Sequence, residues 1–252
     1  MPATTAAAAL ALQQTRLSLP PWTPATLLDF GAGTGSMAWA AAVQVPSVTA
    51  MTLLEQSAEA MRLGRSILAA TELPVLRLAT WRAWRLPDGG GSPDRSAGLA
   101  ADLATVSYVL GELTQAQQAA LVAITVTAAP AVVLVEPGTP AGHRRILAAR
   151  GQLLAAGCLV AAPCPHELRC PLQTEGDGCH FGPRSRPDGN GRLGARPSPP
   201  RGHSRDRETQ PEVVRTAVSG RTSVGGRRGG AGLVRRLAAT PEQRAPVLPG
   251  SS

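Results

Sequence analysis

Cysteine and histidine are concentrated in one short segment of this sequence. The chain has four cysteines and four histidines in 252 residues, yet three of those cysteines and two of the histidines lie within seventeen residues of the run APCPHELRCPLQTEGDGCHF, residues 162–181. The cysteines of this run are Cys164, Cys170 and Cys179. No basic segment precedes the apolar start MPATTAAAALAL, so we expect no secretory signal and a reducing compartment. Clustered thiols in that setting are typical of metal ligands rather than of disulfides.

Three glycines at alternate positions form a second group with possible chemistry. The run TLLDFGAGTG places Gly31, Gly33 and Gly35 directly after Asp29. A dinucleotide site of the G-x-G-x-x-G type needs a third glycine where this chain has Ser36, so a nicotinamide cofactor is a poor match. Alternating glycines instead favour a turn whose backbone approaches a ligand closely, with Asp29 as an acceptor for an ammonium group.

Glu55 adds a carboxylate to this group. It lies twenty residues beyond Gly35, at the end of a second β-rich run, where it can accept both hydroxyls of a ribose. Together these features resemble the S-adenosylmethionine site of class I methyltransferases. The resemblance implies S-adenosylmethionine as cofactor and five binding residues, namely Asp29, Gly31, Gly33, Gly35 and Glu55. The alternative is a tight turn that binds nothing.

Two further carboxylates follow later apolar runs. Glu112 in SYVLGEL and Glu136 in VEPG come after the expected fourth and fifth strands, at the edge where open α/β sheets bind ligands. Functional and structural roles are equally compatible with their positions. The sequence shows no general base and no nucleophile, and methyl transfer can proceed through proximity and alignment alone. We therefore assign no catalytic residue.

Aromatic and basic residues offer a candidate RNA contact. Trp81 and Trp84, with Arg82 and Arg85 beside them, can stack on exposed bases, although their spacing is more typical of packing. Arg144, Arg145 and Arg150 can contact phosphate or form a solvated helix face.

The elements that must position these groups alternate between strand and helix. Helices are expected over residues 3–17, 36–44, 57–70, 113–127 and 139–157. Strands are expected over residues 26–30, 48–54, 73–78, 102–107, 131–135 and 159–162. Thr139 caps its helix with Pro140 in the first position, and Gly157 ends it. This alternation predicts an α/β fold with a mainly parallel sheet.

Composition separates the chain into two regions. Residues 1–181 carry 11 arginines and 12 acidic residues, whereas residues 182–252 carry 14 arginines and 5 acidic residues. The second region also has 9 prolines, 12 glycines and no aromatic residue, so we expect a largely disordered tail in which residues 211–218 are an exception. The longest apolar stretch, residues 119–135, is interrupted by Thr125, Thr127 and Pro130, and no membrane span is expected.

Four motifs in order carry a wider resemblance. These are LLDFGAGTG, SYVLGEL, VEPGTPAGHRRILAARGQLLAAG and APCPHELRCPL with CHF, which together cover about residues 2–181. They resemble the methyltransferase-like proteins of the small ribosomal subunit in bacteria and mitochondria. The resemblance implies a class I methyltransferase (Rossmann-like) fold, a partner in the small subunit or its ribosomal RNA, and an iron–sulfur cluster. It also implies the bacterial cytoplasm or, in a eukaryote, the mitochondrial matrix.

The cysteines fit that family only in part. Cys164, Cys170 and Cys179 match its cysteine positions, and spacings of six and nine are too wide for a zinc knuckle. A [4Fe–4S] cluster usually needs four thiolates, and the remaining cysteine is Cys158, which is either the fourth ligand or a buried apolar residue. The alternatives are substitution by a histidine, His166 or His180, and a reduced loop that holds no metal.

The family sequence continues differently after CHF. Here the chain becomes the lysine-free run GPRSRPDGNGRLGARPSPPRGH, as an out-of-frame reading of a GC-rich gene would give. We therefore expect the sheet to lack its last strand and the cluster its fourth ligand. The domain hypothesis is a methyltransferase-like domain over residues 1–181, which includes the cysteine loop 162–181, and a disordered or frameshifted tail over residues 182–252.

Two functions remain open at this point. The first is an S-adenosylmethionine-dependent methyltransferase-like protein that acts on small-subunit ribosomal RNA, or in small-subunit assembly or translation. The second is a non-catalytic iron–sulfur assembly factor that retains the fold, and the absence of an Asn-Pro-Pro-Tyr motif after the fourth strand favours it. A small-molecule methyltransferase is a third, weaker possibility.

Overall fold

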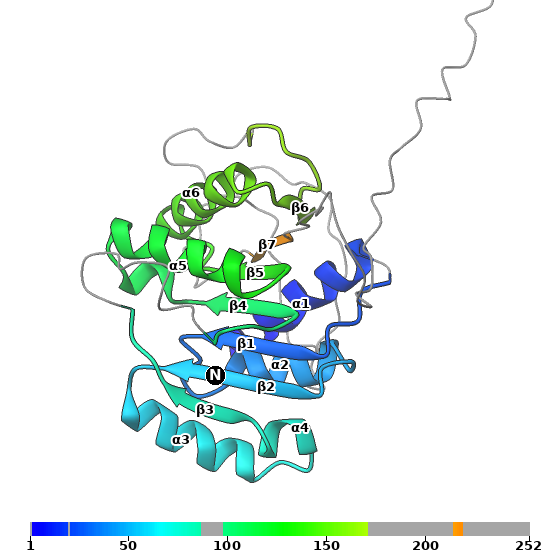
Figure 1. Cartoon of the computed structure of the whole chain (residues 1–252), viewed down its shortest axis with the longest axis vertical. Coiled ribbons are helices and arrows are strands. Elements are labelled where there is room, and N and C mark those ends of the chain that lie inside the picture. Colours follow the sequence, from blue (N-terminus) through cyan, green and yellow to red (C-terminus); the bar gives the residue numbers. More distant parts are fainter. Residues whose placement is uncertain (1, 20, 87–97, 171–213, 219–252) are drawn as a thin grey trace, which may run out of the picture. The chain divides into compact units, whose positions relative to one another are not determined.

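The computed structural model describes residues 2–19, 21–86, 98–170 and 214–218 (Figure 1). Its helices are α1 (Pro2–Ser18), α2 (Ser36–Gln44), α3 (Ala58–Ala69), α4 (Pro74–Arg77), α5 (Gln115–Ala128) and α6 (Pro140–Ala155), with a 3₁₀ turn at Leu110–Glu112. Its strands are β1 (Thr26–Phe30), β2 (Ala50–Glu55), β3 (Thr80–Ala83), β4 (Leu103–Ser107), β5 (Ala131–Val135), β6 (Leu159–Ala162) and β7 (Val214–Val218). None of the helices described has the length and apolar character needed to cross a bilayer.

One sheet organises these elements. Its strand order is β3-β2-β1-β4-β5-β7-β6, with β1 to β5 parallel and β7 antiparallel to both of its neighbours. The mainly parallel α/β sheet predicted from the sequence is therefore confirmed. The order reverses between β1 and β4, so the helices that follow these strands lie on opposite faces and leave a crevice at the carboxyl edge of the sheet.

Both faces of the sheet are buried. Along β1, Leu27 belongs to a core cluster that includes residues of α1, α2 and α4, whereas Leu28 belongs to a cluster that includes residues of α5 and α6. Leu53 and Leu54 of β2 divide between the two clusters in the same way. Successive side chains of a strand point to opposite faces, so apolar runs such as TLLDF and AVVLV suit a strand covered on both sides. The result is a three-layer arrangement, visible in Figure 1.

Local signals explain several element boundaries. Thr139 accepts the N–H of Gly142 at the start of α6, and Pro140 occupies the first turn, as predicted. Gly157 has a φ of +82° and follows the helix end. Thr114 and Gln117 form a reciprocal capping box at the start of α5. Capping chemistry of this kind is local, which is why these boundaries were predictable.

The predicted strand over residues 73–78 is wrong. Pro74 stands in the first turn of the short helix α4, and the third strand is β3, which lies a few residues later. The short apolar run that contains Leu73, Val75, Leu76 and Leu78 resembled a strand, but a proline at the first helical position is also a helix start. Leu76 is buried in the core cluster that includes α1 and α2 residues, so packing selects the helix.

The basic tail contributes a strand to the sheet. β7 comes from residues 214–218 and lies between β5 and β6, with Val133 paired to Thr216 and Leu159 paired to Val218. The expectation that the sheet lacks this strand is therefore wrong, and the exception expected at residues 211–218 coincides with it. The other residues of the predicted tail lie outside those described, as do residues 171–181 of the cysteine loop.

Candidate cofactor-binding site

The glycine turn connects β1 to α2. The N–H groups of Gly31 and Ala32 both donate to the carbonyl of Leu54, at 2.8 and 2.9 Å, and tie the turn to the neighbouring strand β2. Gly31, Gly33 and Gly35 have φ values of +70°, +55° and +94°. These are left-handed conformations that glycine adopts without steric cost, and they explain the alternate spacing.

The three glycines face different surroundings. A Cβ on Gly31 would collide with the side chain of Val109, and one on Gly35 would lie 3.3 Å from Leu68. A Cβ on Gly33 would meet nothing within 4 Å. Gly31 and Gly35 therefore allow close packing of the protein on itself, whereas Gly33 leaves open space beside the turn.

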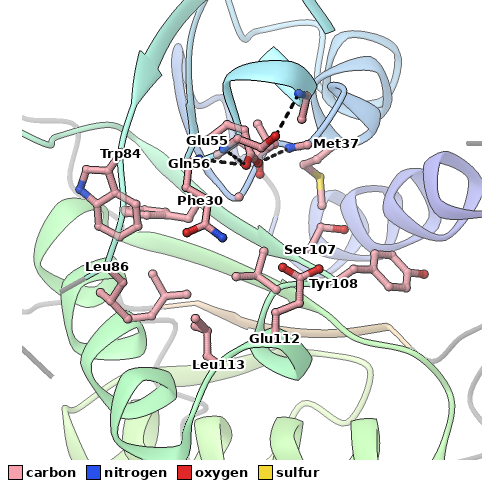
Figure 2. Close-up of a pocket in the computed structure, with 18 of the residues that line it drawn as sticks. Phe30, Met37, Glu55, Gln56, Trp84, Leu86, Ser107, Tyr108, Glu112 and Leu113 are labelled. Carbon is pink, nitrogen blue, oxygen red and sulfur yellow. Dashed lines mark hydrogen bonds between the residues drawn. The ribbon is translucent and has the colours of Figure 1, made fainter. Parts of the chain in front are cut away.

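Glu55 holds the turn from the end of β2. One carboxylate oxygen accepts the N–H of Gly33 at 2.8 Å, and the other accepts the N–H groups of Gln56 and Ser57, both at 2.8 Å (Figure 2). The residue is only 8% exposed. A carboxylate has about four acceptor positions, so three backbone bonds fix its orientation and still leave capacity for a ligand hydroxyl.

Asp29 is buried beneath the same turn. It is 1% exposed, and the Thr105 hydroxyl on β4 donates to it at 2.7 Å. Burial raises the pKa of Asp29 from 3.8 to about 7, the Thr105 bond lowers it, and the charge of Glu55 raises it. A cationic group beside Asp29 would favour the ionised form. An ionised Asp29 has the charge needed to accept an ammonium group.

These groups border a cavity of about 670 Å³ at the carboxyl edge of the sheet. Its walls come from the glycine turn, the end of β2, the segment after β3 and the segment after β4, and they include Asp29, Gly31, Gly33 and Glu55. Cofactor pockets in proteins commonly have volumes of about 300–1,000 Å³. Gly35 packs on Leu68 beside the turn instead. The structure thus brings together the predicted site residues, four of them in the wall itself.

The segment after β4 supplies wall residues that no sequence motif indicated. Ser107 and Tyr108 line the cavity, and Tyr108 has a φ of +62°, an uncommon conformation for a residue with a side chain. Its N–H donates to the carbonyl of Val135 at 2.8 Å. Ser107 was recognisable as the last residue of a parallel strand, but no sequence signal marks the backbone of Tyr108. Thr4 of α1 also lines the cavity, and only tertiary packing brings it there.

The two carboxylates left open by the sequence have different roles. Glu112 is exposed, lines the cavity and approaches it from the side opposite Glu55 (Figure 2). Glu136 is 1% exposed and is bonded to the Arg145 guanidinium at 2.7 Å. It also accepts the N–H of Leu110 at 3.0 Å. Glu136 is therefore a buried structural carboxylate that connects α6 to the cavity wall.

Trp81 and Trp84, the candidate RNA contacts, both pack against other residues of the fold. Trp84 lines the cavity and meets Phe30 edge to face, with 5.2 Å between ring centroids. Trp81 is half-buried, and its ring lies against Gly64 of α3. Packing, the more typical reading of their spacing, describes both.

The cysteines are placed only in part. Cys158 is 2% exposed within the core cluster that includes α5 and α6 residues, whereas Cys164 and Cys170 are half-buried. Arg150 donates to the carbonyls of His166 and Leu168 at 2.6 and 2.9 Å and so ties this segment to α6. Cys179 and His180 lie outside the described residues. Within the described part of the chain no three potential ligands come together in a metal-binding group, so Cys158, Cys164 and Cys170 do not form one by themselves.

The strand order, the glycine turn after β1 and the carboxylate at the end of β2 define a class I methyltransferase fold. Sequence comparison is more specific, because residues 1–194 match the Rsm22 family, described as mitochondrial small ribosomal subunit Rsm22, and the chain belongs to that family. The human ribosome assembly protein METTL17, mitochondrial, is 31% identical over 184 residues. That match covers 67% of this chain and 39% of the human protein, so the chain spans about two fifths of its relative's length.

Solved structures give a looser likeness. A Pyrococcus horikoshii protein described as a candidate RNA methyltransferase is 14% identical, with a TM-score of 0.46 over 62% of this chain and 71% of that one. An O-methyltransferase family protein from Burkholderia thailandensis is 12% identical, with a TM-score of 0.46 over 64% of this chain and 55% of that one. The strand order of the sheet carries the fold assignment independently of these overlaps.

Proposed function

We propose that this chain binds S-adenosylmethionine in the cavity beside the glycine turn and acts on the small ribosomal subunit, as a methyltransferase of its RNA or in its assembly. The observation that carries the proposal is the convergence of Gly33, Asp29 and Glu55 on one cavity. Membership of the Rsm22 family supports the small subunit as partner, and the mitochondrial relative supports the matrix as location in a eukaryote. In a bacterium the same role belongs to the cytoplasm.

The residues present fit this cofactor. The open space beside Gly33 accommodates a ligand against the backbone, the remaining acceptor position of Glu55 accepts a ribose hydroxyl, and Asp29 accepts the ammonium group. When bound, the cofactor supplies an activated methyl group. Trp84 and Leu86 form an apolar wall that excludes water, and Ser107 and Glu112 remain to orient an acceptor. No residue is assigned as a base, because positioning alone can carry much of such a transfer.

Calorimetry with S-adenosylmethionine tests the site. Gly33→Ala adds a methyl group into the open space, and we expect at least a tenfold loss of affinity. Gly157→Ala is the matched control, because Gly157 also has a positive φ, +82°, and nothing within 4 Å of its Cβ position. Gly33→Val should abolish binding. Glu55→Ala should weaken it through the loss of the ribose contact, with Glu59→Ala, an exposed carboxylate on α3, as control. Unchanged affinity in Gly33→Val and Glu55→Ala would refute the assignment.

A non-catalytic iron–sulfur assembly factor is the second candidate. The observation that favours it is the bonding of Arg150 to the segment between Cys164 and Cys170, which holds two half-buried thiols in one ordered segment. We propose Cys164, Cys170 and Cys179 as ligands of a cluster. Cys158 is packed in the core, so it fits a fourth ligand position poorly.

Two measurements on the full chain separate the candidates. Labelled S-adenosylmethionine with small-subunit particles should give methyl incorporation if the chain is an enzyme, and stable binding without incorporation if it is an assembly factor. Iron and sulfide analysis after anaerobic purification measures the cluster content. Zinc in place of iron would show that the proposed metal is wrong.

A further inference from the structure

Arginines gather at one edge of the sheet. Between residues 58 and 86 the chain has five arginines and two acidic residues, a net charge of +3. The rest of the described residues carry six arginines and six acidic residues and are neutral. We call the five the basic rim: Arg62, Arg65, Arg77, Arg82 and Arg85. Leaving aside the parts of the chain that are not described, the excess positive charge of the fold is located here.

The basic rim follows the elements at the β3 edge. α3 contacts both α4 and β3, and β3 pairs with β2 at the end of the described sheet (Figure 1). All five arginines are exposed, and the Arg62 side chain is 79% exposed although it lies 3.9 Å from Glu59. Exposed guanidinium groups can bind anionic groups through charge and paired hydrogen bonds.

The rim passes around the edge and reaches the cavity. Arg65 on α3 donates to the carbonyl of Trp81 on β3 at 3.3 Å, and the Trp81 ring packs on the α3 side. Because neighbouring side chains on a strand point to opposite faces, Arg82 projects from the other side of the sheet. Arg85, three residues further on, lines the cavity itself. The charged surface therefore leads from α3 to the proposed cofactor site.

We propose that the basic rim binds the phosphate backbone of RNA and leads a single-stranded segment toward the cavity. The inference rests on the proposed function, since it supplies the acceptor strand for that site. Phosphate attracts arginine through paired hydrogen bonds as well as charge. RNA fits better than a membrane surface, because a strand can follow a rim that ends inside a cavity whereas a bilayer cannot enter it.

The test uses the full chain and a single-stranded RNA oligonucleotide from the small-subunit RNA, with affinity measured by fluorescence anisotropy between about 0.05 and 0.3 M salt. The rim variant is Arg62→Gln/Arg77→Gln/Arg82→Gln, which spares Arg65 and Arg85 because these contact β3 and the cavity. The control is Arg16→Gln, an exposed arginine of α1 that lies outside the basic rim and has no proposed contact with phosphate. The basic residues after residue 181 are present in every variant, so their contribution is constant.

Each phosphate contact contributes about 0.7 to the slope of log affinity against log salt for single strands. Loss of three contacts should lower the slope by about 2 and the affinity at about 0.1 M salt roughly a hundredfold. The control should keep the wild-type slope. Arg62→Lys/Arg77→Lys/Arg82→Lys should restore the salt slope and part of the affinity, since lysine returns the charge but not the paired hydrogen bonds.

Equal affinity and slope for the rim variant and the control would overturn the proposal. So would weaker binding to small-subunit particles with unchanged binding to naked RNA, because that result assigns the rim to a protein partner. Calorimetry with S-adenosylmethionine on the same preparations keeps the two hypotheses apart. If the rim variant loses RNA binding but no preparation, wild type included, binds S-adenosylmethionine, the cofactor site is refuted. The role of the basic rim in RNA binding is then still supported.

Discussion

At the scale of single residues, Asp29 links the stability of the fold to pH. Its folded-state pKa is about 7, against 3.8 for the ordinary side chain, because burial disfavours the charge. Between these values the folded chain keeps a proton that the unfolded chain has released, so the free energy of unfolding falls as pH rises from about 4 to 7. The slope is at most ~1.4 kcal/mol per pH unit, and the contribution is constant above pH 7.

The substitution Asp29→Asn should remove this dependence. The amide oxygen can still accept the Thr105 hydroxyl, and no charge is buried. We expect a melting temperature equal to that of the wild type below about pH 4, where Asp29 is largely protonated in both states, and higher than the wild type at pH 8. Glu112→Gln, an exposed carboxylate at the other side of the cavity, should show no such gap. The same Asp29→Asn variant should bind S-adenosylmethionine more weakly at pH 8, because an amide cannot pair with an ammonium group. Identical pH profiles for Asp29→Asn and wild type would contradict this account.

Some residues of the site were predictable from the sequence around them, and others depend on tertiary packing. Asp29, the glycines and Glu55 were predictable, because a strand, a turn and a second strand that follow one another along the chain fix their relative positions. The outcome for Glu112 and Glu136 was not predictable. Both follow strands, yet one lines the cavity and the other is buried against Arg145, and only the packing of α6 decides which.

At the scale of elements, the Glu136–Arg145 pair connects α6 with the segment after β4. Glu136 is buried and also accepts the N–H of Leu110, while the Arg145 guanidinium lies over Gly111. Burial raises the pKa of Glu136 above 4.5, and Arg145 lowers it. The pair therefore holds the wall that contains Tyr108 and Glu112 against α6.

Arg145→Ala should leave Glu136 without its cation and destabilise the fold by about 3 kcal/mol. The effect should grow with pH, since the unpaired carboxyl must then ionise in a buried position. Arg144→Ala, at an exposed neighbouring position, should change stability by less than ~0.5 kcal/mol. Urea unfolding measures both. The double variant Glu136→Gln/Arg145→Ala should recover part of the loss, and an equal loss in the single and double variants would show that packing of the Arg145 stem is what matters.

Helices were predictable from the sequence where a capping residue marks the helix start, and ambiguous where no cap is present. Thr114, Ser57 and Thr139 each accept a backbone N–H at a helix start, and the helices there were predicted within a few residues. In residues 73–83 the signals conflict, because Pro74 permits a helix start while the short apolar run permits a strand. Burial of Leu76 in the core decides for the helix, and burial is not a property of the segment alone.

At the scale of the whole molecule, the sheet depends on a strand far along the chain. β7 fills the position between β5 and β6, and no periodicity in its Arg-, Gly- and Pro-rich surroundings indicates that it pairs there. Pairing over this distance in sequence depends on two strand edges that only the folded domain creates. The sequence therefore predicted the half of the fold that contains the glycine turn better than the half that β7 completes.

Two truncated chains test the contribution of β7. One ends at residue 221 and retains the strand, and the other ends at residue 212 and lacks it, while both lack residues 222–252. Without β7, the facing edges of β5 and β6 lose their hydrogen-bond partners, and exposed strand edges also promote association. We expect the shorter chain to melt at least ~10 °C below the longer one, since a few kcal/mol shift the melting temperature of a domain of this size by that amount. Light scattering should also show association of the shorter chain. If both chains melt together as monomers, β7 adds nothing to stability, and the contacts of β6 with α6 and α1 are sufficient to hold it.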